Sequence, residues 1–177
     1  MSTKAKLLRR FAILENERQI LLTKLEQLDP VLLQTAPGPE EWSVAQVMLH
    51  LAIAEGSAMA YLRKKLEVGG HGPPDVTAPL RLLLLNTALA LPIKFKAPAI
   101  VATVPACTYA DARAQWDAVR SDMRHVLDGI PEKYVGHGLF KHPSAGKFDL
   151  VQGLRFMTHH VRHHHGQIQR ILGRLTT

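Results

Sequence analysis

Hydrophobic positions recur with helical spacing along most of the chain and mark out four long segments. In each segment the apolar residues return every three or four positions, which is the period of an α-helix with about 3.6 residues per turn. No stretch alternates convincingly with the period of two that a half-buried β-strand requires. The pattern therefore predicts an all-α fold, with long helices over residues 4–28, 43–68, 109–128 and 149–175.

The starts of two of these helices carry clear capping signals. Ser43 is followed three residues later by Gln46, and Asp149 by Gln152, which is the reciprocal pairing of a capping box. Gly69–Gly70 is expected to end the second helix, because glycine readily adopts the left-handed conformation that follows a last turn. These signals place the helix boundaries independently of the apolar pattern.

The segments between the long helices are rich in proline and glycine. A loop over residues 69–79 leads into a short, strongly apolar helix over Pro79–Leu91, and an irregular connection follows over Pro92–Pro105. Residues 131–147 are predicted to form a loop. Four long helices pack most economically as a bundle, so residues 1–177 are expected to form one four-helix bundle domain with a short extra helix between its second and third long helices.

The formal charge of +7 would permit binding to nucleic acid, an acidic membrane surface or a small anion. The basic residues are spread along the chain, however, and aromatic residues make up only 6% with no interleaving that would suggest stacking on bases. Nucleic-acid binding is therefore the weakest reading, and solvated helix faces explain the charge better.

Three further features restrict the class of protein. A single cysteine, Cys107, excludes an internal disulfide and a cysteine-based zinc site. The longest apolar run, Leu82–Ile93, is interrupted by Asn86 and too short to span a bilayer. The charged N-terminus lacks the apolar core of a signal peptide, so we expect a cytoplasmic protein with no membrane segment.

The predicted last helix carries five of the ten histidines, among them two pairs at the i, i+4 spacing that lets two imidazoles reach one ion. By helical-wheel arithmetic, His160 and His164 lie about 60° from the middle of the apolar face, at its rim. His159 and His163 lie about 160° away and are expected to face solvent. The inward pair is thus the candidate half of a transition-metal site.

A third imidazole comes from the second long helix, where His50 lies at the edge of the apolar face. A lone histidine there is usually structural, and histidine runs are often solvated surface. Opposite a helix that offers His160 and His164, however, His50 becomes the natural third ligand. Three protein ligands leave a coordination position open, as in catalytic sites. Zinc is the default metal, and nickel or cobalt would also suit imidazole.

Three other polar residues are weaker candidates for roles in catalysis. Gln167, one turn past His164, could bond a metal-bound group or a ligand nitrogen, although it could equally be an ordinary rim residue. Tyr61 lies on the same side of its helix as His50 and could line a pocket. Glu55 could act as a general base, but its helical phase points away from His50, so an exposed or salt-bridged carboxylate is the better interpretation.

Several short motifs of the chain are characteristic when taken together. A tryptophan precedes the helix that carries His50 (Trp42–Ser43), and Lys94–Pro98 is a proline-flanked Lys-Phe-Lys-Ala-Pro connection. Residues 142–148 read His-Pro-Ser-Ala-Gly-Lys-Phe, and residues 160–168 contain His-x-x-x-His and then Gly-Gln-Ile. With these motifs the chain resembles the DinB/YfiT-like superfamily, also called DUF664-type proteins, over most of its length from the first helix onward.

This resemblance implies an up-down-down-up four-helix bundle, commonly a homodimer, in which His50, His160 and His164 hold a divalent metal. Characterised relatives include thiol transferases that use bacillithiol, mycothiol or glutathione, and others are described as metal-dependent hydrolases. Some relatives carry a histidine after the triad where this chain has Gln167, so their mechanisms do not transfer directly.

Two classes of function are therefore considered for this protein, and we expect its partner to be a small-molecule substrate or thiol. The first is a metal-dependent enzyme of thiol S-transferase type, in which a metal-activated low-molecular-weight thiol attacks an electrophile, or of hydrolase type. The alternative is a non-enzymatic metal-binding or stress-response protein. A solvent-open metal position favours the enzyme, and a sealed site favours the structural role.

Overall fold

The computed structural model describes residues 2–69, 72–90, 104–142 and 145–176. Within them, the long helices are α1 (Thr3–Leu25), α3 (Val44–Val68), α6 (Tyr109–Gly129) and α7 (Leu150–Leu175). The shorter elements are α2 (Pro30–Gln34), α4 (Ala78–Ala90), the 3-10 turn η1 (Glu132–Tyr134), β1 (Phe140–His142) and β2 (Gly146–Phe148).

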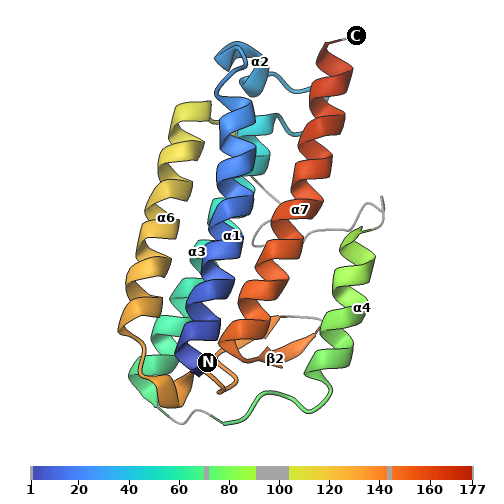
Figure 1. Cartoon of the computed structure of the whole chain (residues 1–177). Coiled ribbons are helices and arrows are strands. Elements are labelled where there is room, and N and C mark those ends of the chain that lie inside the picture. Colours follow the sequence, from blue (N-terminus) through green and yellow to red (C-terminus); the bar gives the residue numbers. More distant parts are fainter. Residues whose placement is uncertain (1, 70–71, 91–103, 143–144, 177) are drawn as a thin grey trace.

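The long helices form a bundle with up-down-down-up topology. Figure 1 shows α1 and α7 running in one direction and α3 and α6 running in the other. Helix α1 packs against α7 and α6, and α3 packs against the same two helices from across the bundle. Helix α4, in the connection between α3 and α6, lies beside α7. The predicted four-helix bundle with a short extra helix is therefore confirmed.

Both predicted capping boxes are present. The Ser43 hydroxyl accepts a hydrogen bond from the Gln46 backbone N–H, and the Gln46 side chain accepts one from Ser43 N–H. Asp149 and Gln152 exchange the same pair of bonds at the start of α7. Because each box fixes the first turn of its helix, the helical phase of His50, His160 and His164 follows directly from these ends.

The chain after α1 differs from the prediction. Helix α1 ends at Leu25, not at residue 28, and the short helix α2 follows in a segment for which no element was predicted. Asp29 caps α2 by accepting a hydrogen bond from Val31 N–H, and Pro30 occupies its first position. A five-residue helix is too short to show apolar periodicity, so only these two cap residues signalled it.

The segment predicted as a loop after α6 contains the two-stranded hairpin β1–β2. Its strands pair antiparallel with Phe140 opposite Phe148, both buried against the bundle. A Cβ on Gly153 of α7 would lie 2.6 Å from the Phe140 ring, so this glycine lets the hairpin approach the helix closely. Strands of three residues are too short for an alternating pattern to be recognised. The connection predicted over residues 92–105 falls largely outside the described residues.

The core lies between the four long helices and is continuous along the bundle. Across the described residues, no helix combines the length and apolar character needed to cross a membrane. The predicted apolar face of α7 is buried for most of its length, through Leu154, Met157, Val161, Ile168 and Ile171. Two groups of polar side chains interrupt this core, one of histidines and one of ion pairs.

Candidate metal centre

Three imidazoles from two helices meet inside the bundle. His50 of α3 and His160 and His164 of α7 each offer one ring nitrogen, and these nitrogens all lie within 4.8 Å of one another. The His50 ring centroid is 4.7 Å from that of His164 and 5.5 Å from that of His160. His50 and His164 are only 4% and 7% exposed. The structure thus brings together the three residues that the helical phase selected.

The two α7 histidines of this cluster are held as neutral bases. Burial lowers the pKa of His164 to about 3, with a further contribution from the positive charge that His50 can carry. Burial also lowers the pKa of His160 well below its usual value, reinforced by repulsion from His164 and His50. Both rings are therefore uncharged at neutral pH and present nitrogen lone pairs.

Gln167 fixes which nitrogen of His164 carries its proton. The Gln167 Oε1 atom lies 2.7 Å from His164 Nδ1, and an amide oxygen can only accept a hydrogen bond. His164 Nδ1 therefore donates, which leaves Nε2 as the free base facing the cluster. This contact is the ligand-nitrogen bond that the sequence analysis considered for Gln167.

Aromatic rings pack against the histidine cluster. The Trp42 ring centroid lies 5.1 Å from that of His50, and Phe156 stacks against His160 at 5.8 Å. His142 of β1 contacts Phe156 edge-on, with the two ring centroids 4.9 Å apart. Phe156 and His142 were not identified from the sequence. Phe156 could have been, because it lies four residues before His160 on the same face of α7.

Other predicted residues lie away from the cluster. Tyr61 is eleven residues beyond His50 on α3, about 16 Å along the helix axis, and Lys65 lies over its ring. His159 and His163 were expected to face solvent, but both are half-buried. The His163 ring lies 5.1 Å from that of His164, so it adjoins the cluster without offering a nitrogen to it.

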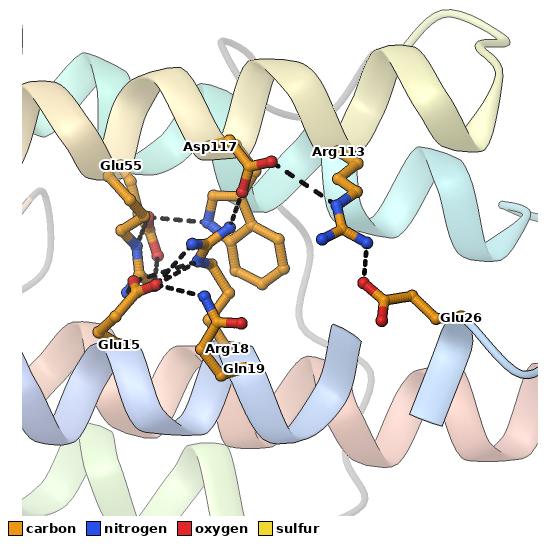
Figure 2. A network of polar contacts seen from close by, with 9 residues as sticks. Glu15, Arg18, Gln19, Glu26, Glu55, Arg113 and Asp117 are labelled. Carbon is orange, nitrogen blue, oxygen red and sulfur yellow. Dashed lines mark hydrogen bonds and ion pairs between the residues drawn. The ribbon is translucent and has the colours of Figure 1, made fainter. Parts of the chain in front are cut away.

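Glu55 points away from the cluster, as its phase predicted, but it is only 2% exposed. Arg120 Nε and Nη2 donate to its two oxygens at 2.7 and 2.8 Å, and Trp116 Nε1 donates at 2.9 Å. Glu15 joins Arg120 to Arg18, so α1, α3 and α6 share one ion-pair network (Figure 2). Its residues are Glu15, Arg18, Glu55, Trp116, Asp117 and Arg120.

Two arginines, Arg18 and Arg120, lie over the buried ring of Trp116, and neither was identified from the sequence. Arg18 and Arg120 are 5% and 2% exposed. The signal was present, because Arg120 follows Trp116 by four residues on the inward face of its helix. A charged residue at an inward position predicts a buried partner of opposite charge, and Glu55 fits that role.

A divalent cation fits the donor set of the histidine cluster. Imidazole nitrogens bind zinc at 2.0–2.1 Å, so two ligands of a tetrahedral site lie roughly 3.3 Å apart. His160 Nε2 and His164 Nε2 are 3.0 Å apart, close to that separation. Two neutral bases this near to each other must share a proton or a cation, and the third nitrogen lies within 4.8 Å of both.

The fold and this cluster together define the class: an all-α, four-helix bundle protein with three converging histidines between α3 and α7. The sequence model of the DinB superfamily matches residues 13–168, so the chain belongs to the DinB superfamily. This confirms the family resemblance of the sequence motifs. None of the curated proteins compared with the chain is similar enough to count as a match.

Among solved structures, the chain is similar to YfiT from Bacillus subtilis, which is described as a probable metal-dependent hydrolase with an unusual four-helix bundle topology. The two share 19% sequence identity with a TM-score of 0.58, over 96% of this chain and 87% of YfiT. At this identity the similarity supports the fold.

Proposed function

We propose that this DinB-superfamily protein binds one divalent metal ion through His50, His160 and His164, and that it is a metal-dependent enzyme. The observation that carries the proposal is the convergence of three ring nitrogens from two helices, two of them on rings held neutral. The description of YfiT as a probable metal-dependent hydrolase supports the same reading. Zinc suits three imidazoles best, and nickel or cobalt would also fit.

The bound metal would supply Lewis acidity, which lowers the pKa of a water or thiol at its open position. The protein's own residues prepare that position. Gln167 holds His164 in the tautomer whose Nε2 is free. Trp42 and Phe156 cover the rings of His50 and His160, which limits the access of bulk water.

Of the two reaction types, thiol transfer agrees better with the surroundings of the cluster. Hydrolysis benefits from a general base, usually a carboxylate, beside the attacking water. The candidate, Glu55, is instead bound by Arg120 and Trp116. A small thiol needs no separate base, because the metal's charge already favours its ionised form. Its sulfur would bond to a carbon of the electrophile, whose leaving group departs with the bonding electrons.

The first test is elemental analysis of protein purified without an affinity tag. We expect one divalent metal per chain in the wild type and its loss in His160→Ala. His159→Ala, one residue away but outside the cluster, should keep the metal and serves as the matched control. Full metal occupancy in His160→Ala would remove the basis of the site.

Turnover assays on the metal-loaded protein then separate the function classes. Consumption of a small thiol together with an epoxide or alkyl halide supports transfer, and cleavage of esters or amides supports hydrolysis. Metal bound at full occupancy without either reaction would favour the non-enzymatic alternative, a metal-binding or stress-response protein.

A further inference from the structure

The β1–β2 hairpin is anchored beside the first turns of α7 (Figure 1). Phe140 of β1 approaches α7 so closely that a Cβ on Gly153 would lie 2.6 Å from its ring. On the other strand, the Lys147 N–H donates to Asp75 Oδ2 at 3.0 Å, and the Lys147 carbonyl accepts from the Asp75 N–H at 3.1 Å. The hairpin is therefore fixed both to α7 and to the chain that leads into α4.

His142 continues the contact between the hairpin and α7. It lies two residues after Phe140 on the same strand, so both side chains point to the same face of the hairpin. Phe140 meets Gly153, and the His142 ring meets Phe156 edge-on, with centroids 4.9 Å apart and ring planes at 66°. Phe156 in turn stacks on His160, with centroids 5.8 Å apart and ring planes at 11°. The hairpin thus reaches a candidate metal ligand through one aromatic ring.

The plane of the His160 ring matters because the lone pair of a ring nitrogen lies in that plane. Metal-binding histidines are ordinarily oriented by a hydrogen bond to their second ring nitrogen. His164 has such a bond to Gln167. His160 lies instead almost parallel to Phe156, so turning its ring out of this plane would break the stacked contact. The two α7 ligands are therefore oriented from opposite ends, His164 by Gln167 and His160 by Phe156.

His142 is itself held in place as an uncharged ring. Phe148 of β2, which is buried, stacks on it with centroids 6.5 Å apart and ring planes at 19°. Burial lowers the pKa of His142, so its imidazole is neutral at neutral pH. A neutral ring edge against an aromatic face is a favoured arrangement of two aromatic side chains. Phe148, His142, Phe156 and His160 thus form one continuous row of rings from the hairpin to the histidine cluster.

We propose that His142 is a positioning residue of the metal centre, which acts through Phe156 to fix the ring plane of His160. The inference rests on the proposed metal site and deepens it, because it makes the metal affinity depend on a hairpin that supplies no ligand. The contribution expected from one aromatic pair is about three- to tenfold in metal affinity.

The test measures cobalt binding to tag-free protein by competition with a chromophoric chelator, together with the cobalt d–d absorption, which reports ligand geometry independently of turnover. We expect His142→Ala to keep one cobalt per chain but to bind it about three- to tenfold more weakly, with altered d–d bands. His142→Phe retains an aromatic ring at this position and should restore both the affinity and the bands. Lys141→Ala is the matched control, because Lys141 is the exposed neighbour of His142 on β1, and it should behave as the wild type.

Phe156→Leu tests the same row of rings from α7 and serves also if His142→Ala folds poorly. It should weaken cobalt binding at least as much as His142→Ala, and the double variant should show no further loss, because His142 acts through Phe156. The positioning role is overturned, while the metal site stands, by wild-type affinity and bands in His142→Ala, by additive losses in the double variant, or by His142→Phe that fails to restore binding. Wild-type protein without cobalt d–d bands overturns the metal site and this inference together.

Discussion

Two groups of polar side chains are buried in the same bundle, and they are built on opposite principles. The histidine cluster lies between α3 and α7, and the ion-pair network lies among α1, α3 and α6. Helix α3 contributes to both, through His50 and, five residues later, Glu55. In the network every buried charge meets an opposite one. In the cluster, bases face other bases.

The difference indicates which group needs something from outside the chain. Arg120 and Arg18 are satisfied by Glu55, Glu15 and Asp117, so the network is complete as it stands. In the cluster, the neutral rings of His160 and His164 bring two nitrogens within 3.0 Å of each other, which is close to the spacing of two ligands on one cation. A saturated network is expected to hold the helices in register, whereas converging neutral bases are expected to bind a ligand.

The largest effect is expected from Arg120→Leu. This change leaves the Glu55 carboxylate buried and unpaired except for Trp116, so the free energy of unfolding should fall by about 3–5 kcal/mol in urea denaturation. The double variant Arg120→Leu with Glu55→Leu removes the orphaned charge as well and should recover much of the loss. Metal content should not change in either folded variant.

A loss below about 1 kcal/mol in Arg120→Leu would contradict the role of the network, since it would mean that Glu55 tolerates burial alone. A parallel loss of metal would contradict the separation of the two regions. Either outcome would contradict the distinction between a stabilising ion-pair network and a ligand-binding histidine cluster.

A smaller loss of unfolding free energy is expected when protein that a chelator has stripped of metal is brought to acid pH. The folded pKa of His164, about 3, lies below its unfolded value of 6.5, so its stabilising contribution is full above pH 6.5 and declines as the pH falls toward 3. Between pH 6.5 and 5 this histidine should cost about 2 kcal/mol of unfolding free energy. His160 acts in the same direction.

The measurement is the slope of unfolding free energy against pH, compared between the wild type and His164→Leu. Only the difference in slope is informative, because other groups titrate in the same range. Equal slopes would mean that His164 is not held neutral in the folded protein. Metal-loaded protein should show a slope at least as steep as that of stripped protein, because the metal keeps the imidazoles unprotonated in the folded state and unfolding frees them to take up protons.

Much of the fold and the geometry of the histidine cluster could be predicted from the sequence, because both depend on helical phase. Two capping boxes fix where α3 and α7 begin, and from there the positions of His50, His160 and His164 follow at 100° per residue. The hairpin β1–β2 could not be predicted in this way, because its strands are shorter than the pattern that identifies a strand.

The ion-pair network was hidden for a different reason. Glu15 and Arg18 of α1, Glu55 of α3 and Arg120 of α6 form one network only after the three helices pack. Charged residues are usually assigned to solvent. Helical phase shows which way a side chain points, but not whether another helix supplies the opposite charge.

The smallest effect is expected at the rim of the network, where Arg113 contacts Glu26 and Asp117 (Figure 2). These side chains are 34%, 41% and 46% exposed, so water already solvates the charges that the pair would neutralise. Arg113→Ala should therefore lower the free energy of unfolding by less than about 1 kcal/mol, and a double-mutant cycle with Glu26→Gln should give a coupling of similar size. Arg113 and Arg120 lie on the same helix seven residues apart and both meet two carboxylates, so their contrast isolates burial from charge pairing. Equal losses of unfolding free energy in Arg113→Ala and Arg120→Leu would show that charge pairing stabilises the bundle whether or not it is buried. The ion-pair network would then differ from the histidine cluster only in composition.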